Sequence, residues 1–403
     1  MKLELQEIYW HGDRERIMSL DFLKQSVPLL VTAGAEMSTS AYIRLWQLTF
    51  ENSQLVAKHL EDLAGTHERS VNVVRVSPAG DCIASGADDA CIVIWAKKKK
   101  QIFGSDKEEE GWGSIRVLRG HMGEVHDLAW SETGRIIASA SMDASVIVFE
   151  VSSGKVVQRI EGFNKLVSGV SLSRNLLAAM SNDRTLKVFK KGKKGYYIKH
   201  SVKDFEKNKL FQDESSASAF FRRLSFSQDG NLLLAPAGMY ADTPVVHCFM
   251  RKNLSVPSVC YPVNINKSER CAALAVKMCP LYFKASESGC VSGLDYKLVW
   301  AVATLEAVLI YNSEFLSPVK AVSNSHLLSL TDLAWFGDRI LAVSSLDGYV
   351  SFIIFEEGEL GEVIEVEQQP MEVEEQTPVK ENVAQTTQKN DGKKRICPEL
   401  ISN

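Results

Sequence analysis

The chain repeats one pattern in two stretches: VNVVRVSPAGDCIASGADDACIVIW (residues 71–95) and VHDLAWSETGRIIASASMDASVIVF (residues 125–149). A histidine precedes each stretch, at His67 and at His121. In both copies an aspartate follows the histidine after 22 residues, and an aromatic residue follows it after 28 residues. Self-similarity at a fixed spacing indicates a repeated structural unit, which must be identified before any other feature is interpreted.

Each repeat has the residue types of several short strands joined by turns. The runs VNVVRV and HDLAW are β-branched or aromatic, as strands require, and the clusters SPAGD and SETGR are typical of turns. The next runs, IASGA and IASAS, consist of small residues that suit a crowded position beside a neighbouring unit. A third strand, IVIW or VIVF, follows the aspartate. This order predicts a β-propeller blade and therefore a scaffold for binding other proteins.

The repeats resemble WD repeats, in which a loop histidine, a strand serine, a turn aspartate and a strand aromatic residue hydrogen-bond within one blade. The resemblance assigns these roles to His67, Ser85, Asp89 and Trp95 in one copy, and to His121, Ser139 and Asp143 in the other. Phe149 occupies the aromatic position of the second copy and has no N–H to donate, so we expect that network to be incomplete. These histidines and aspartates are interpreted as structural rather than catalytic.

Weaker copies extend the pattern to seven blades. Asp183 precedes Phe189 by six residues, as Asp89 precedes Trp95, and Asp347 occupies the matching turn of a copy near residue 350. Further copies begin at MSLDF, RRLSFSQDG and CAALAVKM, the last with a distorted turn. The final copy shows only three strands, so we expect LELQEIYW at the N-terminus to supply its outer strand and to protect the sheet edges by closing the ring. The sequence thus predicts an all-β, seven-bladed WD-repeat β-propeller over residues 1–360.

Composition agrees with a soluble protein that has a large core. Hydrophobic residues make up 45% of the chain and charged residues 24%, with a net charge of −4. We find no apolar run of membrane-spanning length and no signal-peptide core, so we expect no membrane association. The eight cysteines form no CxxC pair, which argues against disulfides and zinc sites and favours a reducing compartment.

The sequence lacks motifs for catalysis. No Walker loop, GxSxG or HExxH motif is present, so we expect no enzyme activity, no cofactor and no metal site. The small net charge and the location of the lysine blocks in predicted loops also argue against sequence-specific DNA binding.

Three segments depart from the repeat. Residues 97–114 are interpreted as an insertion between the second and third blades, and residues 190–218 as one between the fourth and fifth. Both begin with lysine blocks, KKKK and KKGKK, which are typical either of solvated loops or of nuclear import signals. A glutamate-rich tail starts near Glu356, and we expect residues 361–403 to be disordered because they contain too few apolar residues to form a core.

Beyond the repeats, the chain resembles the family of WD-repeat, middle-sized subunits of chromatin assembly factor one. The most specific strings are FFRRLSFSQDGNLLLAPAG (residues 220–238), FMRKNL and DGYVSFIIFEEGELG, and the resemblance covers nearly all of residues 1–361. It implies a nuclear histone chaperone subunit that acts with a large and a small subunit. Such a complex deposits core histones three and four on newly replicated DNA, where the replication clamp recruits it. The inserts and tail are short for the family.

Two other functions remain compatible with the sequence. The WD-repeat subunit of a replication-independent histone chaperone has a related propeller, but it is much longer, with a second large domain. A substrate-receptor propeller of a ubiquitin ligase would carry a WDxR-type motif, whereas Trp95 is followed here by Ala-Lys-Lys and Trp46 by Gln-Leu-Thr.

The end of the chain, KKRICPELIS, resembles the short B-domain motif with which chaperone subunits dock the anti-silencing-function histone chaperone. The matching residues are Lys393, Lys394, Arg395, Ile396, Pro398 and Leu400. The resemblance implies an extended peptide that adds to a sheet edge. A nuclear import signal is the alternative, and it needs only the three basic residues.

Overall fold

The structure is a computed structural model of the chain. It describes residues 1–366 except residues 7, 9, 13–14, 35–41, 53, 102–107, 206–207, 214–220, 265–271, 288 and 292. The described residues belong to the first compact unit, Met1–Gln368. They form strands, turns and loops and no helix, so none of them forms a helix long and apolar enough to cross a membrane.

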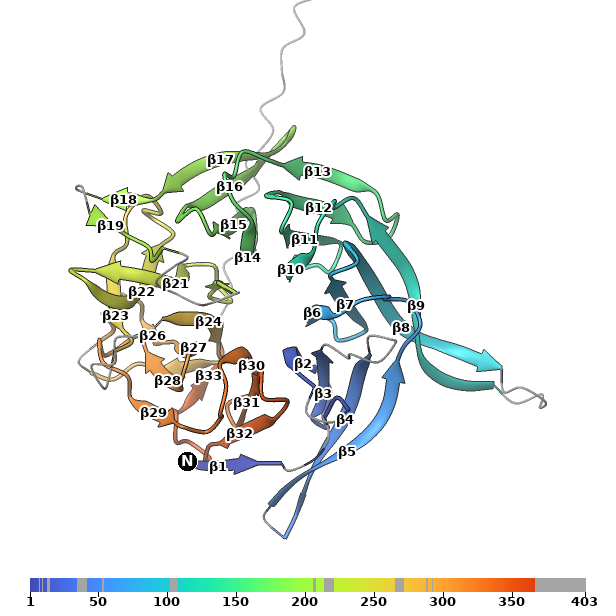
Figure 1. The fold of residues 1–403 in the computed structure, drawn as a ribbon. Coiled ribbons are helices and arrows are strands. Elements are labelled where there is room, and N and C mark those ends of the chain that lie inside the picture. Colours follow the sequence, from blue (N-terminus) through green and yellow to red (C-terminus); the bar gives the residue numbers. More distant parts are fainter. Residues whose placement is uncertain are drawn as a thin grey trace, which may run out of the picture. The chain divides into compact units, whose positions relative to one another are not determined.

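The described residues form seven four-stranded antiparallel sheets, called blades one to seven below in chain order (Figure 1). Blade one contains β2 (Ile17–Leu23), β3 (Leu29–Gly34), β4 (Ile43–Glu51) and β5 (Gln54–Leu63). Blade two contains β6 (Val71–Val76), β7 (Cys82–Ala87), β8 (Cys91–Gln101) and β9 (Glu108–Arg119). Blade three contains β10 (Val125–Trp130), β11 (Ile136–Ser141), β12 (Val146–Glu150) and β13 (Val156–Ile160). Blade four contains β14 (Val167–Ser173), β15 (Leu176–Ser181), β16 (Leu186–Gly192) and β17 (Gly195–Val202).

The last three blades are less regular. Blade five contains β20 (Ser225–Phe226), β21 (Leu232–Tyr240), β22 (Thr243–Met250) and β23 (Val259–Pro262). Blade six contains β24 (Ala273–Met278), β27 (Val299–Thr304), β28 (Ala307–Asn312) and β29 (Lys320–Ser323). Blade seven contains β30 (Leu330–Phe336), β31 (Ile340–Ser345), β32 (Val350–Ile354) and β1 (Lys2–Leu5). Two small sheets are added, one of β18 (Asp204–Phe205) and β19 (Asn208–Lys209), the other of β26 (Tyr296–Lys297), β25 (Tyr282–Lys284) and β33 (Val363–Ile364).

The innermost strands close a ring. Strands β2, β6, β10, β14, β20, β24 and β30 each contact the next in this order, and β30 contacts β2 (Figure 1). The N-terminal strand completes blade seven, because Leu3 pairs with Ile353 in an antiparallel β1–β32 ladder. The predicted all-β propeller and its closure by the N-terminal strand are therefore confirmed.

The core lies between neighbouring blades. One cluster, for example, combines Val31 and Leu45 of blade one with Val74 and Ile83 of blade two. The small residues of the second strands are required by this packing. A Cβ at Gly86 of β7 would lie 2.6 Å from a methyl group of Val125, which belongs to the next blade.

Both predicted insertions are placed incorrectly by the sequence interpretation. Residues 97–101 and 108–114 belong to β8 and β9 and pair with each other, so these described parts of the segment lie within blade two. Lys99 faces Glu110 across this pair, and opposite charges in facing positions favour strand pairing. In blade four the block at residues 190–194 forms the end of β16 and the turn to β17, so the extra segment begins only after Val202.

The described first part of the predicted glutamate-rich tail is folded. Residues 356–366 return to the propeller, where Val363 of β33 pairs with Phe283 of β25. Glu359 forms ion pairs with Lys320 and with the N-terminal amino group of Met1. The apolar residues in LGEVIEV supply the packing that a count of glutamates overlooks. The remaining predicted tail, residues 367–403, lies outside the described residues.

Candidate functional site

A β-bulge interrupts the innermost strand pair at the same place in six blades. The register shifts by one residue near the start of β2, β6, β10, β14, β24 and β30. The residues skipped in these ladders are Met18, Asn72, His126, Ser168, Leu274 and Thr331. A bulged residue is left out of the regular pairing, so its backbone carbonyl needs another donor when it is buried.

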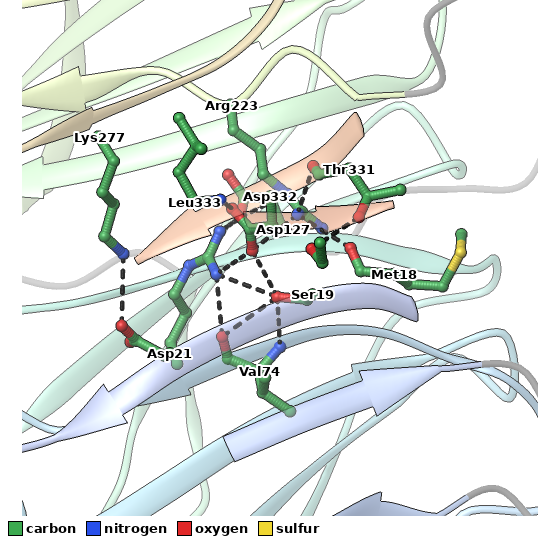
Figure 2. Close-up of polar contacts among 12 residues, drawn as sticks. Met18, Ser19, Asp21, Val74, Asp127, Arg223, Lys277, Thr331, Asp332 and Leu333 are labelled. Atoms are coloured by element: carbon green, nitrogen blue, oxygen red, sulfur yellow. Dashed lines mark hydrogen bonds and ion pairs between the residues drawn. The ribbon is translucent and has the colours of Figure 1, made fainter. Parts of the chain in front are cut away.

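Arg223, from the FFRRLSF string, supplies donors to four of these residues. Its guanidinium donates to the carbonyls of Met18 and Thr331, each at 3.1 Å. It also donates to the carbonyl of Asn72 at 2.7 Å, and its backbone N–H donates to Leu274 at 2.9 Å. One residue at the start of blade five thus bonds to blades one, two, six and seven, as the labelled contacts to Met18 and Thr331 illustrate (Figure 2).

A buried ion network surrounds this guanidinium. Asp332 accepts from Arg223 at 2.8 Å and from Arg75 at 2.7 Å. Arg75 also donates to Asp127 at 3.1 Å, and the Ser19 hydroxyl donates to Asp332 at 2.6 Å. The two carboxylates are 2% exposed. Two arginines and two aspartates from four different blades therefore form one buried ion network among the innermost strands. Figure 2 labels Arg223, Asp127 and Asp332 of this network.

The pKa values of the two aspartates are shifted in opposite directions. Burial opposes the charged form of both, but Arg223 and Arg75 hold the pKa of Asp332 below its ordinary value. For Asp127, burial outweighs Arg75 and Arg223 and raises the pKa. Asp332 has the closer arginine contacts, at 2.8 and 2.7 Å against 3.8 and 3.1 Å for Asp127. The network links blades, and its charged groups have one another as ion-pair partners.

Sequence reasoning did not identify this network, although the sequence carried a signal for it. Asp127 and Asp332 occupy the same place after the bulge in their innermost strands, and Ser19 occupies that place in blade one. A charged residue inside an apolar strand run, as in HDLAW and TDLAW, requires a buried partner. What the sequence could not provide is the partner, because Arg223 lies far away in the chain.

The side chains assigned to the WD-type contact in blade two lie together. The His67 Nδ1 atom is 2.9 Å from Asp89, and its Nε2 atom is 2.7 Å from the Ser85 hydroxyl. The Trp95 indole donates to the same hydroxyl at 2.8 Å. Burial opposes ionisation of Asp89, but the hydrogen bond from His67 lowers its pKa. The imidazole therefore ties the loop to the turn and to β7.

Blade three repeats this arrangement without the aromatic donor. His121 contacts Asp143 at 2.9 Å and Ser139 at 2.7 Å. As the sequence predicted, Phe149 donates nothing, but Ser145 and Arg159 add contacts: the Ser145 hydroxyl donates to Asp143 at 2.6 Å, and Arg159 donates to Ser145 at 2.9 Å. Against the effect of burial, the bonds from His121 and Ser145 hold the pKa of Asp143 below its ordinary value.

The other two assigned aspartates use different partners. Asp347 lies 3.1 Å from His326, whose Nε2 atom contacts Ser351 on β32 rather than a serine on β31. Asp183 accepts instead from the backbone N–H groups of Asn164 and Thr185, at 3.0 and 2.9 Å. It therefore stabilises its turn without a histidine.

Blade one contains a contact of this kind that sequence reasoning missed. The His11 Nε2 atom lies 2.9 Å from the Thr32 hydroxyl, and the Trp46 indole donates to that hydroxyl at 2.9 Å. Burial, with a smaller effect of Arg44, lowers the pKa of His11 to about 3. The similarity of this contact to the one in blade two is hidden in the sequence for two reasons. Threonine replaces serine, and the segment between the histidine and the aromatic residue has a different length.

The predicted docking residues Lys393, Lys394, Arg395, Ile396, Pro398 and Leu400 lie outside the described residues. Within the described part of the chain, no group of three or more histidine, cysteine, aspartate or glutamate side chains is arranged to hold a metal ion. The buried Cys248 and Cys279 thiols have pKa values of about 12, raised by burial, which disfavours the reactive thiolate.

Comparison with known proteins is consistent with this architecture. Residues 1–360 match the family model described as the CAF1B/HIR1 beta-propeller domain. The chain is 36% identical to the B-subunit of chromatin assembly factor 1 of Mus musculus over 403 residues, which cover 90% of this chain and 68% of that protein. It is 31% identical to the protein of the same name from Saccharomyces cerevisiae, covering 86% of this chain and 84% of that protein.

A more distant relative has a different length. Protein HIR1 of Yarrowia lipolytica is 28% identical over 346 residues, which cover 77% of this chain but 32% of that protein. The match over residues 1–360 includes every blade and the Arg223 network, so it covers the ring as a whole. The chain belongs to the CAF1B/HIR1 β-propeller family.

Proposed function

We propose that this chain is the WD-repeat subunit of a histone chaperone that assembles chromatin, and that it acts as a non-catalytic scaffold. The observation that carries the proposal is the similarity to the B-subunit of chromatin assembly factor 1 across 86–90% of this chain in two distant organisms. A closed ring offers two faces and a rim on which other proteins can bind. The described blade contacts and the buried ion network hold these surfaces in place.

The proposed partners follow from the family and from the charges of the chain. They are a large and a small subunit of the same complex, with core histones three and four held directly or through those subunits. Histones are strongly basic, so acidic segments favour their binding. Glu110 on β9 and the glutamates of residues 356–381 provide such charge here. The proposed location is the nucleus, and the proposed role includes no enzyme activity and no sequence-specific DNA recognition.

Co-purification tests the role of the whole chain. A tagged full-length chain, isolated from nuclear extract, should carry a large chaperone subunit and histones in stoichiometric amounts. Cullin-adaptor proteins in their place would contradict the proposal and favour a ubiquitin-ligase receptor. Recovery of the subunits of a replication-independent chaperone would favour the HIR1-like alternative, because the matching family model also includes HIR1 propellers.

We also propose that residues 393–402 dock the anti-silencing-function histone chaperone. In an extended peptide, Ile396 would fill an apolar pocket and Arg395 would pair with surface acids, while Pro398 would end the strand pairing because it has no N–H. A peptide of residues 385–403 should bind that chaperone in calorimetry, and Ile396→Ala should weaken binding by at least ~1 kcal/mol. A nuclear import signal would tolerate this change, so equal binding by both peptides would refute docking.

A further inference from the structure

A cup opens at the centre of the face on which the innermost strands begin. It has a volume of about 380 Å³, which is large enough for one long side chain. Its floor includes the bulged residues Met18, Asn72 and Thr331, whose carbonyls are held by Arg223. The guanidinium is therefore bonded to residues that line the cup.

The two sides of the cup differ in chemistry. Asp88, which follows β7, and Glu124, which precedes β10, form one side. The other side comes from blades six and seven and is mainly apolar, with Leu305 and Leu346 beside Ser329 and Thr331. The apolar part of a long side chain could therefore lie against the leucines while its charged end meets the carboxylates.

Neither carboxylate forms an ion pair with a lysine or arginine side chain among the described residues. Asp88 accepts a hydrogen bond from the neutral Asn72 amide at 2.6 Å. Burial and the nearby Glu124 raise its pKa, and they outweigh the opposing effects of that hydrogen bond, of His126 and of the exposed Arg69. The partner of Glu124 is His126 at 3.5 Å, and burial lowers the pKa of that histidine to about 4, so it is neutral near pH 7. Arg16 also lines the cup, but within the described structure no ion pair joins it to either acid.

Two exposed apolar residues each lie two positions along the chain from a residue that lines the cup, Met122 from Glu124 and Leu327 from Ser329. Met122 follows His121 in blade three and is 90% exposed, and Leu327 follows His326 in blade seven and is 91% exposed. Both loops are fixed, because the backbone N–H of Met122 donates to Asp143 and that of Leu327 donates to Asp347. Large apolar side chains held in water by rigid loops favour contact with another protein.

We propose that this cup binds an extended segment of a partner protein that inserts one lysine or arginine between Asp88 and Glu124. Apolar residues on either side of that basic residue lie on Met122 and Leu327. The cation supplies the charge that the two carboxylates lack, and its hydrocarbon stem covers the leucines of the opposite side.

Selection from a library of random seven-residue peptides, displayed on phage and applied to the full chain, tests this proposal. The selected peptides should share a central lysine or arginine with apolar neighbours. The strongest peptide should bind at least tenfold more weakly to Asp88→Asn or Glu124→Gln in calorimetry, and replacing its basic residue by norleucine should have the same effect. Leu327→Ala should weaken binding at least fivefold, as truncation of a contact residue does.

Asp81→Asn is the matched control. Asp81 lies at the other end of β7 and accepts from Ser77 at 2.7 Å, so the variant makes the same charge change on the opposite face. It should bind the peptide as the unmodified chain does. The proposal is overturned if no peptide class is lost on changing Asp88 or Glu124, or if the selected peptides lack a basic residue. Displacement of the selected peptide by residues 385–403 would assign the cup to the end of this chain instead of a partner.

Discussion

Replacing Arg223 with methionine should destabilise the whole ring, although the residue touches no outer strand. Methionine fills much of the same volume but donates no hydrogen bond. The change would leave the carbonyls of Met18, Asn72 and Thr331 without the guanidinium donor. It would also leave Asp332, which is 2% exposed, with Arg75 as its remaining arginine partner.

The expected loss can be derived from these contacts. A buried polar group that loses its partner costs about 1–3 kcal/mol, so three carbonyls give a loss of at least ~3 kcal/mol. A second estimate comes from the charges: breaking a buried ion pair by removing one partner costs about 3–5 kcal/mol, which begins at the value obtained from the carbonyls. Because both figures describe the removal of one side chain, they are not added. We expect a decrease of about 3–5 kcal/mol in the free energy of unfolding.

Urea unfolding of the full-length chain, followed by tryptophan fluorescence, measures this change. Arg135→Met is the control, because Arg135 is exposed and should change stability by less than about 0.5 kcal/mol. Arg223→Lys should give an intermediate loss, since an ammonium keeps the charge but cannot reproduce the planar fork that bonds several carbonyls. Combining Arg223→Met with Asp332→Asn should cost clearly less than the sum of the single changes, because the second change removes the carboxylate that has lost one of its two arginine partners.

Two outcomes would refute this reasoning. A loss for Arg223→Met that is no larger than the loss for Arg135→Met would mean that water or a neighbouring group replaces the guanidinium. Strict additivity of Arg223→Met and Asp332→Asn would mean that the 2.8 Å contact between the two residues carries no energy.

Three further predictions concern the ring, pH and DNA. Deleting residues 1–9 should expose the edge of β32 and cause aggregation, and a monomeric product with an unchanged melting temperature would show that β1 does not protect that edge. Burial lowers the pKa of His247 to about 4, so the unfolded chain binds a proton first as pH falls below 6.5, and this histidine alone should lower stability by up to about 3 kcal/mol between pH 6.5 and 4. His247→Gln should reduce the slope of stability against pH by this share, and the buried His11 and His126 should account for part of the slope that remains. Binding to DNA should be weak and lost with modest salt in a titration, and tight, salt-resistant binding to one sequence would contradict the proposed role.

The sequence predicted the repeated part of this fold because the repeats form the same local contacts at the same spacing along the chain. The spacing from His67 to Asp89 places both side chains at one end of a blade, where they meet at 2.9 Å. The same spacing gives the contact between His121 and Asp143. His11 escaped this reasoning because the spacing that identifies the contact is absent there. A pattern defined by distance along the chain finds only the copies that preserve that distance.

Charge runs were the least reliable guide to structure. Lysine and glutamate blocks predicted solvated loops at residues 97–114, yet the two blocks pair as strands of one hairpin. The glutamates after residue 356 predicted a disordered tail, yet β33 pairs with β25. In both cases the relevant information was which residue faces which across a strand pair. Composition counts charges but does not contain that register.

The string that most clearly indicates the family lies where the repeat is weakest. β20 of blade five contains only two residues, and the segment before it carries Arg223 into the centre of the ring (Figure 2). There Arg223 donates hydrogen bonds to bulged residues of four other blades. The segment that departs from the repeat therefore helps to hold the ring closed. The cup lies on the same bulged residues, which couples its floor to the stability of the ring. Glu124 has His126 as its partner at 3.5 Å, whereas Asp88 accepts from the Asn72 amide, whose residue also bonds Arg223. Glu124→Gln therefore separates partner binding from folding more cleanly than Asp88→Asn, and the unfolding free energy of both variants is measured beside their binding.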